Sequence, residues 1–364
     1  MERQTDILII GQGICGTFLS WELDRAGVSH IVIDEERPDT ASRAAAGLIN
    51  PVTGRRIVTT WMIDELLPFA KEAYRQLGEI LDGSYLETAA VIDFFPTPQM
   101  RIAFQQRYGE APEYLQLPAD EHYWDKYFRY DLGYGIVSPC YLVDMPGLLS
   151  AARRWMRERE VLLEEKFEVG EMRVDEVAGG PDAAMRVRYR DIEARRVIFC
   201  DGIESFSGPY FSRLPFAPNK GEALILEIPG LAHTGSPIFK KGISLVPWRD
   251  GLYWAGSSYE WSFEHSEPTE AFRVKMERAL QEWLKLPFRT VQHMASVRPA
   301  TLERRPFVGF HPVHTAVGIL NGMGTKGCSL APFFAHQLVQ HITKGSLIRP
   351  DADVRRFSKI LSRS

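Results

Sequence analysis

The sequence has 364 residues but only four cysteines, Cys15, Cys140, Cys200 and Cys328, and no two of them form a Cys-x-x-Cys pair. This spacing argues against a disulfide or zinc framework, and free thiols suit a reducing compartment. Also absent are an apolar run of the ~18 residues that a membrane span requires and a secretory signal before the first strand. We therefore expect a cytoplasmic globular protein without a membrane span.

A strong excess of one charge sign is lacking as well, because the net charge at pH 7 is −4. This balance gives no general attraction to nucleic acid, although it leaves a local basic patch open. None of the nine histidines has a catalytic or metal-binding spacing, and neither a P-loop nor a serine-nucleophile motif occurs. We expect no metal site, and we expect His311 and His314 to be solvated in a turn.

What the sequence does contain is a glycine-rich motif near its N-terminus. An apolar strand at 6–10 is followed by Gly-Gln-Gly-Ile-Cys-Gly at 11–16, a helix-like stretch and a second strand at 30–33. In such a turn the backbone amides can approach a pyrophosphate, and the last glycine permits close packing of helix on strand. An acid at the end of the second strand can accept hydrogen bonds from ribose hydroxyls. The predicted dinucleotide site comprises Gly11, Gly13, Ile14, Gly16, Asp34 and Glu35.

This motif alone does not distinguish NAD from FAD. A chain that binds only NAD usually continues in βαβ alternation, whereas residues 40–47 here read Thr-Ala-Ser-Arg-Ala-Ala-Ala-Gly. Small residues let a backbone run along an extended ligand, which favours FAD. A flexible connector is the alternative reading of this segment, and an NAD-dependent dehydrogenase stays open. We expect residues 37–56 to form a long loop.

The remaining pattern indicates further helices together with antiparallel strands. Helical periodicity occurs at 63–81, 146–159, 270–286 and in a C-terminal helix that starts near Leu330 with Pro332 in its first turn. Runs rich in β-formers occur at 195–199, 224–228, 243–246 and 252–255. Asp250-Gly251 between the last two runs is a hairpin turn signal. Residues 88–135 are aromatic and punctuated by proline, which suggests an insertion with irregular strands.

Four segments together resemble the FAD-dependent D-amino-acid oxidase and glycine oxidase superfamily: GQGICG with Asp34, ASRAAAGLINP at 41–51, RPATLERRPFVG at 298–309 and NGMGTKGCSLAP at 321–332. They are also similar to the flavin domain of the bifunctional tRNA wobble-uridine modifying enzyme. The resemblance covers nearly the whole chain in order. It implies an α/β fold in which a Rossmann-like FAD-binding domain (1–87, 141–215 and 295–364) carries an inserted mixed or antiparallel-sheet substrate domain (88–140 and 216–294).

The resemblance also assigns cofactor contacts along the chain. It implies that FAD lies along Ser42, Arg43, Ala45, Ala46 and Gly47, with Phe167 at the position whose backbone meets adenine. Asp201 and Gly202 stand where the family has a small-residue turn beside the cofactor, and an aspartate is unusual there. A glycine-rich loop before the C-terminal helix would face the flavin pyrimidine, where a helix N-terminus stabilises negative charge. Its residues are Gly322, Gly324, Thr325, Lys326, Gly327 and Cys328.

On the substrate side, Arg298 aligns with the arginine that holds the substrate carboxylate in glycine oxidase, close to the cofactor. A guanidinium suits this role because it binds carboxylates with two parallel hydrogen bonds, although a structural ion pair with Glu303 is the alternative. Tyr259 matches a tyrosine of the tRNA-modifying relatives. Ser244 replaces the substrate-binding tyrosine of glycine oxidase, which weakens the case for free glycine. The aromatic residues Tyr253, Trp254 and Trp261 are candidates for the pocket wall, and the core is their alternative location.

The activity that the resemblance implies is oxidation of the C–N bond of a small amine or amino acid. A hydride would pass from the amine-bearing carbon to flavin N5, and the electrons would then pass to oxygen or another acceptor. Two alternatives stay open beside this reading. One is action on an amine carried by tRNA, and the other is a flavin-binding protein without turnover.

Overall fold

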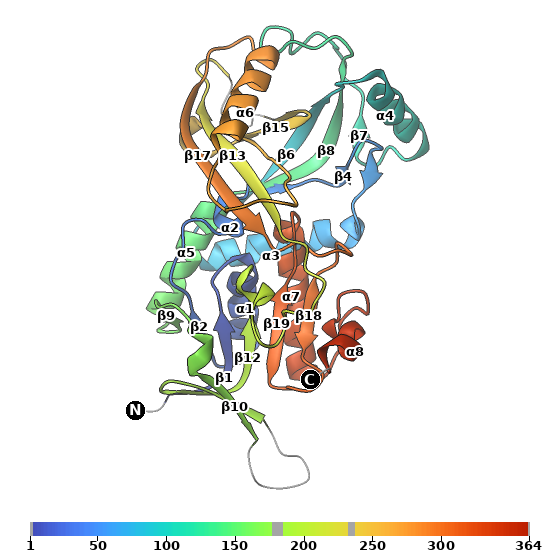
Figure 1. The fold of residues 1–364 in the computed structure, drawn as a ribbon. Helices are drawn as coiled ribbons and strands as arrows, with labels where there is room; N and C mark the ends of the chain where they lie inside the picture. Colours follow the sequence, from blue (N-terminus) through green and yellow to red (C-terminus); the bar gives the residue numbers. More distant parts are fainter. Residues whose placement is uncertain (1–2, 177–184, 232–236, 363–364) are drawn as a thin grey trace.

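The computed structural model describes residues 3–176, 185–231 and 237–362. Two sheets lie one above the other, with helices between and around them (Figure 1). The lower sheet has parallel β1 (Arg3–Ile10) at its centre, and Ile7 and Ile9 of this strand pack in a different apolar cluster from Leu8 and Ile10. Both faces of β1 are therefore buried, which explains why it reads as a continuous apolar run.

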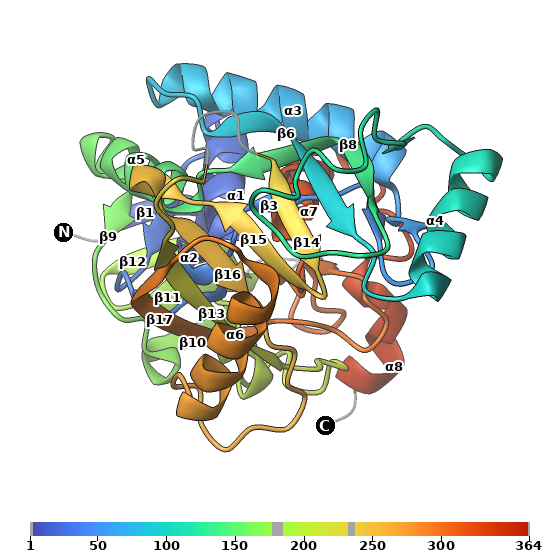
Figure 2. The ribbon, with the colours of Figure 1, turned by 90° about the horizontal axis from the view of Figure 1, so that it is seen from above.

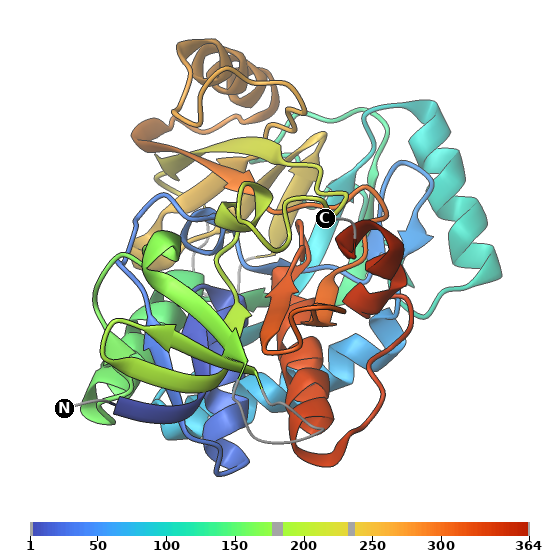
Figure 3. The same cartoon turned by 60° about the horizontal axis from the view of Figure 1, so that its bottom comes forward.

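The lower sheet combines a parallel core with antiparallel edges. From one edge its strands run β10 (Met172–Glu176), β11 (Met185–Tyr189), β12 (Ile192–Phe199), β1, β2 (His30–Ile33) and β9 (Leu162–Leu163), while β19 (Val317–Asn321) pairs with β12 and β18 (Phe307–Phe310). One face is covered by four helices, α1 (Ile14–Arg25), α3 (Ile63–Ile80), α5 (Met145–Glu158) and α7 (Gly327–Lys344). In Figure 3 the bottom of the molecule in Figure 1 is turned forward, and the edge of the lower sheet with β10 and β11 (green) is seen there.

The upper sheet is mixed. Its β14–β6 pair is parallel, and register shifts occur in the β13–β17 and β6–β8 pairs. Its spatial order is β17 (Arg289–Arg298), β13 (Asn219–Glu227), β16 (Tyr253–Gly256), β15 (Ile243–Pro247), β14 (Ile238–Lys241), β6 (Leu86–Phe94), β8 (Tyr134–Val143) and β3 (Leu48–Ile49), with β7 (Leu115–Gln116) beside β8. From above, α6 (Glu270–Trp283) and α4 (Pro98–Glu110) lie at different sides of this sheet (Figure 2).

Side chains of the upper sheet alternate between two apolar clusters. On β13, Leu224 and Leu226 pack with α6 on the outer face, whereas Ala223 and Ile225 belong to the inner cluster. This is the period of two expected for strands covered on both faces. A Rossmann-like parallel sheet joined to a mixed sheet is the predicted fold class, which is confirmed. Among the described residues, no helix combines the length and the apolar composition needed to cross a membrane.

Three local predictions were wrong. Residues 88–135 contain helix α4, in which Thr97 caps the first turn by accepting a hydrogen bond from the amide of Met100 and Pro98 occupies the first helical position. The proline that suggested irregular structure therefore starts a helix. Residues 37–56 are not one loop, because they contain α2 (Ala41–Ala44), β3 and β4 (Val52–Thr53), which pairs with β5 (Val58–Thr59).

Helix α7 begins at Gly327, three residues before the predicted Leu330, so Pro332 lies in its second turn. Proline has no amide with which to bond the carbonyl four residues earlier, that of Cys328. The hydroxyl of Tyr74 on α3 donates a hydrogen bond to this carbonyl at 3.0 Å. A side chain from another helix thus replaces the missing backbone partner. The chain ends with a short helix, α8 (Ser358–Leu361).

Candidate active site

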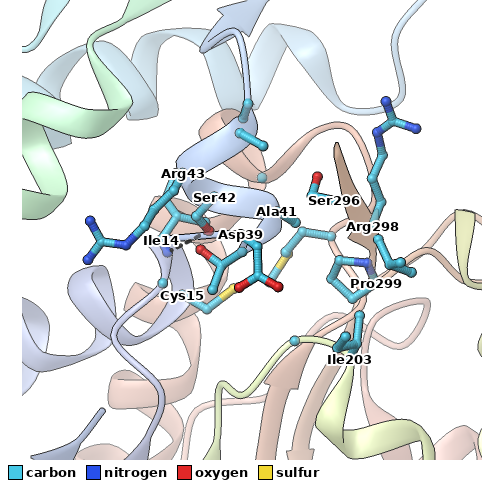
Figure 4. A pocket seen from close by; sticks show the side chains of 18 of the residues that line it. Ile14, Cys15, Asp39, Ala41, Ser42, Arg43, Ile203, Ser296, Arg298 and Pro299 are labelled. Atoms are coloured by element: carbon cyan, nitrogen blue, oxygen red, sulfur yellow. Dashed lines mark hydrogen bonds between the residues drawn. The ribbon is translucent and has the colours of Figure 1, made fainter. Parts of the chain in front are cut away.

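A cavity of about 940 Å³ lies between the carboxyl ends of β1, β2 and β12 and the inner face of the upper sheet. Ile10, Asp34 and Cys200 bring the ends of the three parallel strands to it. Ser244, Trp254 and Arg298 line it from the upper sheet. The carboxyl edge of a parallel sheet is where ligands bind in folds of this type. Side chains from both halves of the molecule converge on the space in Figure 4.

The glycines of the 11–16 motif are required by close backbone packing. Gly11 has φ +98°, and a Cβ atom there would lie 2.7 Å from the carbonyl oxygen of Cys200, the residue after β12. A Cβ on Gly16 would overlap the carbonyl oxygen of Gly11, so the helix can approach the strand only without a side chain. Gly13 faces Ser42, whose Oγ would be 3.1 Å from an added Cβ. The turn is therefore open toward the cavity at Gly11 and Gly13, whereas Gly16 acts in packing and does not line the cavity.

Two helices begin at the cavity and leave backbone amides available there. At α1, the amide of Ile14 donates to Ser42 Oγ at 3.1 Å. Within the described residues, the next two amides, of Cys15 and Gly16, have no acceptor. At α7, the amides of Gly327 and Cys328 likewise lack an acceptor in the described part of the chain. Free amides and the helix dipole make each helix start favourable for negative charge.

Asp34 is held by protein donors at the end of β2. Its Oδ2 accepts from the amide of Gln12 at 2.8 Å, and its Oδ1 accepts from Arg153 Nη1 at 2.7 Å. Arg153 is almost fully buried and also contacts Gln12 Oε1, so the sequence motif and α5 are tied together by this guanidinium. Neighbouring Glu35 lines the cavity as well. Arg153 is a site-supporting residue that sequence reasoning missed, since it is 119 positions from Asp34.

Asp201 lies at the carboxyl end of β12 and lines the cavity. Burial raises the pKa of Asp201 to about 7, against hydrogen bonds to its carboxylate that act in the opposite direction. Those donors are the hydroxyl of Ser205 and Nδ2 of Asn321, which is 3.3 Å from Asp201 Oδ1. Asn321 also donates to the carbonyl of Gly202 at 2.8 Å, so the end of β19 fixes this turn. An aspartate here is thus a half-buried, hydrogen-bonded acid beside the glycine turn.

Arg298 is held at the end of β17 by neutral acceptors. Its Nη1 donates to Asn219 Oδ1 at 2.6 Å and its Nη2 to Ser257 Oγ at 2.7 Å. The ring of Tyr259 stacks against the guanidinium, with 5.1 Å between Cζ and the ring centroid. Glu303, the alternative partner, instead pairs with Arg356 at 3.2 Å. Within the part of the chain that the structure describes, no carboxylate neutralises Arg298. A half-buried cation held by neutral groups can bind a ligand carboxylate.

Most of the predicted contact residues line this one cavity, and the exceptions are specific. Those that line it are Gly11, Gly13, Ile14, Asp34, Glu35, Ser42, Arg43, Ala45, Ala46, Gly47, Phe167, Asp201, Gly202, Arg298, Gly324, Thr325, Lys326, Gly327 and Cys328. Gly16, Gly322 and Tyr259 are not among the lining residues. Tyr259 is 53% exposed and reaches the site only through Arg298.

The three candidate wall aromatics separate. Trp254 lines the cavity, and its Nε1 donates to the carbonyl of Ala44 at 3.1 Å, which joins the upper sheet to the α2 segment. Tyr253 is fully buried on the outer face, and Trp261 is exposed and packs edge-on against Tyr259. The separation of Tyr253 from Trp254 could have been predicted from the sequence, because neighbouring residues on a strand face opposite sides of the sheet. Lys240 is a cavity-lining residue that no sequence motif marked, and Asn219, which holds Arg298, was not marked either.

The prediction that His311 is solvated was wrong. His311 is buried, and its Nδ1 accepts hydrogen bonds from the amides of Val313 and His314 at 3.2 and 3.0 Å. Burial, together with the nearby His314, lowers the pKa of His311 to about 4. A neutral imidazole therefore stabilises this turn from inside, and a turn-rich sequence does not reveal on which side the ring lies. His314 is half-buried.

Comparison with known proteins gives a consistent assignment. Residues 6–341 match the model of the DAO family, described as FAD dependent oxidoreductase. The chain is 25% identical over 350 residues to a glycine oxidase of Bacillus licheniformis, covering 91% of each chain. Glycine oxidase from Geobacillus kaustophilus superposes with a TM-score of 0.77 at 16% identity, over 100% of this chain and 99% of that one. Iminodiacetate oxidase from Chelativorans sp. BNC1 gives 0.74 at 21% identity, over 94% and 97%. The chain belongs to the DAO family of FAD-dependent oxidoreductases.

Proposed function

We propose that this chain binds FAD in the cavity and oxidises the C–N bond of an amino acid or amine whose carboxylate is held by Arg298. The observation that carries the proposal is the meeting of two features in one cavity. One is a pair of helix starts with free amides, at Cys15 and at Gly327. The other is a guanidinium that lacks a carboxylate partner in the described residues. The names of the similar proteins, glycine oxidase and iminodiacetate oxidase, agree with a substrate of this chemistry.

The residues present fit a dinucleotide such as FAD. An added Cβ at Gly11 would meet β12, so the turn at Gly11 and Gly13 keeps its amides close to the cavity surface. The free amides at the start of α1 suit a pyrophosphate, and Asp34 and Glu35 are placed to accept from ribose hydroxyls. The second helix start, at Gly327 and Cys328, suits the charge that a reduced isoalloxazine carries. Arg43 and Phe167 also line the cavity.

When bound, FAD supplies the electron acceptor for the amine-bearing carbon. The protein's own groups bind and orient the substrate. Arg298 would hold the carboxylate with charge-assisted hydrogen bonds, each contributing roughly 1.5–3 kcal/mol. Hydrogen bonds to Asn219 and Ser257 fix the orientation of the Arg298 guanidinium before the substrate binds. This lowers the entropic cost of orienting the substrate carboxylate. Trp254 and Met294 close the inner wall and exclude water from the reacting carbon.

The test is anaerobic reduction of the purified flavoprotein by small amines: glycine, N-methylglycine, proline and D-alanine. Bleaching of the oxidised flavin spectrum by one of them is the expected result, and its rate should fall in Arg298→Ala. A protein that contains no flavin would contradict the cofactor assignment, and a nicotinamide instead would favour the dehydrogenase alternative. If the protein contains flavin but none of these amines reduces it, whatever the size of the amine's side chain, the result would favour a flavin-binding protein without turnover.

An amine carried by RNA is the second candidate, and one observation favours it. Tyr259 and Trp261 are both more than half exposed and pack against each other, and Tyr259 also lies against Arg298. They offer stacking surfaces for a base outside the cavity. Binding of tRNA with a steep salt dependence would support this candidate. The absence of salt-dependent binding would exclude it and leave free amines as the substrate class.

A further inference from the structure

A second cation lies on the cavity side of the upper sheet. Lys240 on β14 lines the cavity, and its Cα pairs with Asp93 on β6 and with Ser244 on β15. Apart from Asp93 and Ser244, the inner-face neighbours of Lys240 are apolar: Ile238 on its own strand, Val91 on β6 and Val246 on β15 belong to the inner cluster. A charged pair inside an apolar wall is costly unless each charge is well partnered. Its presence here therefore needs an explanation.

The pair is only partly satisfied by protein groups. Lys240 Nζ donates to Asp93 Oδ2 at 2.7 Å, and this is its one hydrogen bond within the described residues. The side chain of Asp93 is 3% exposed, and its Oδ1 is buried with no partner in that same part of the chain. Burial raises the pKa of Asp93. An ammonium has three donors, so Lys240 keeps donor capacity on the cavity side while Asp93 holds it from behind.

The path from Lys240 to Arg298 crosses β15, β16 and β13. Ser244 pairs with Gly256, and Gly256 pairs with Ala223, so these strands carry a hydroxyl, a hydrogen and a methyl group here. The indole of Trp254 occupies the space beside Gly256, because a Cβ on this glycine would lie 2.8 Å from its ring and 3.0 Å from the Cβ of Ala223. A ligand that reaches from one cation to the other therefore runs along this indole, which lines the cavity.

The separation of these groups is several strand widths. The Arg298 guanidinium lies over β13, against Gly221, and Lys240 is three strands away across β16 and β15. With neighbouring strands about 4.8 Å apart, three spacings are roughly 14 Å across the sheet. The row of paired residues from Lys240 reaches β13 at Ala223, two residues from Gly221, which adds about 7 Å along the strand and gives a separation of roughly 16 Å between the two backbone positions. A two-carbon amino acid that binds Arg298 cannot also reach Lys240. Only a ligand with an extended arm can contact both.

We infer that Lys240 is a specificity-determining residue that binds an acidic group at the end of a substrate arm. This inference rests on the proposed function, since it takes Arg298 to hold the carboxylate next to the reacting carbon. The substrate class is then an amine or amino acid with a carboxylate at the reacting end and a second anion, carboxylate or phosphate, at the far end. The arm would run along the Trp254 indole, with the small side chains of Ser244 and Ala223 on either side of Gly256.

The experiment measures binding of inert dicarboxylates to the flavin-loaded protein by titration calorimetry. The probes are succinate, adipate, suberate and sebacate, each compared with its monomethyl ester. For the longer diacids we expect binding about ten-fold tighter than for the esters, because the second carboxylate gains a charge-assisted bond to Lys240. Succinate is expected to show no such advantage. In Lys240→Met the advantage of the long diacids should disappear.

Lys241→Met is the matched control, because Lys241 is adjacent on β14 but donates to the carbonyl of Arg129, away from the cavity. If Lys240→Met does not fold, the double variant Lys240→Met with Asp93→Asn is used in its place, because it also removes the buried acid that loses its partner. A diacid advantage that is missing at every length, or that persists in the Lys240 variants, would overturn the inference. Since the probes carry no amine, this result is independent of turnover. Long diacids that bind at both ends, in a protein that oxidises no amine, would refute the proposed function alone.

Discussion

The guanidinium of Arg298 lies directly on the α-carbon of Gly221: a Cβ added to this glycine would overlap Nη2 and Cζ and lie 2.5 Å from Nη1. The two residues are diagonal neighbours on antiparallel strands, since Gly221 pairs with Ser296 and Arg298 pairs with Asn219. The arginine therefore takes its position only because β13 has no side chain at residue 221.

The first prediction concerns this contact. Gly221→Ala should displace the guanidinium and raise KM for carboxylate-bearing amines by about ten-fold or more, since a bidentate contact depends on direction. Steady-state kinetics with an amino acid and with its amine lacking the carboxylate would measure the effect, which should be confined to the amino acid. Gly109→Ala, at an exposed position of α4 with nothing near its added Cβ, is the control. An equal loss for both substrates would indicate general misfolding.

Truncation of the arginine is the second prediction. Arg298→Ala should raise KM for the amino acid by about 100-fold, because two charge-assisted hydrogen bonds are lost. Arg298→Lys should recover only part of this, since an ammonium cannot form the planar fork. The flavin spectrum of each variant reports whether the cofactor site is intact. An unchanged KM in Arg298→Ala would remove this residue from the substrate site.

The third prediction concerns pH. Hydride departure needs the lone pair of the amine, so kcat/KM should rise as pH rises through the pKa of the substrate amine. Two substrates with different amine pKa values should show correspondingly displaced profiles when measured with the same enzyme. A profile that is flat, or that is identical for both substrates, would show that another proton controls the reaction.

Asp201 supplies the fourth prediction. Its pKa of about 7 is above that of an unfolded aspartate, so the folded protein retains a proton that the unfolded chain has lost. This group therefore makes the protein less stable as pH rises from about 4 to about 7. Asp201→Asn should gain stability relative to wild type at pH 8 compared with pH 5, as measured by urea unfolding of the flavin-free protein. The same substitution at exposed Asp131 should produce no such pH-dependent difference.

The fifth prediction tests the replacement of a helix hydrogen bond by a side chain. Tyr74→Phe leaves the Cys328 carbonyl without a donor, because Pro332 has no amide. We expect a loss of about 1–3 kcal/mol in the free energy of unfolding. In a Pro332→Ala background, where the helix can supply the amide, the same substitution should cost less. A double-mutant cycle by urea unfolding measures this coupling, and additive effects would contradict it.

The sequence reveals those parts of the fold that are determined locally. The glycine turn, α1 and the strands next to it follow from spacing and periodicity, and each occurs where it was predicted. Helix α4 was missed because Pro98 was read as a breaker rather than as a first helical residue. The inner and outer faces of the upper sheet also follow from alternation once the strands are known. Tyr253 and Trp254 are neighbours on β16, so one faces the outer cluster and the other the inner cluster. Adjacent aromatic residues on a strand therefore have to be assigned to opposite faces.

The supporting contacts of the site could not be predicted, because they join distant parts of the chain. Arg153 reaches Asp34 across 119 positions, and Lys240 reaches Asp93 across 147. Neither pair belongs to a short motif. The resemblance located Arg298, but it contained nothing about Gly221, whose missing side chain determines where the guanidinium lies. Such relationships depend on sheet register, which a single sequence without a structure does not provide.

The segment that borders the cavity at 41–47 continues directly into β3, an edge strand of the upper sheet. The carbonyl of Gly47 accepts a hydrogen bond from the amide of Val143 on β8. A Cβ on Gly47 would overlap the carbonyl oxygen of Val143. A ligand that orders this segment therefore also fastens the sheet edge, and its binding free energy adds to the stability of both layers. We expect the flavin-loaded protein to melt as one cooperative unit, and a cofactor-depleted protein to be cleaved first by proteases near residues 37–56.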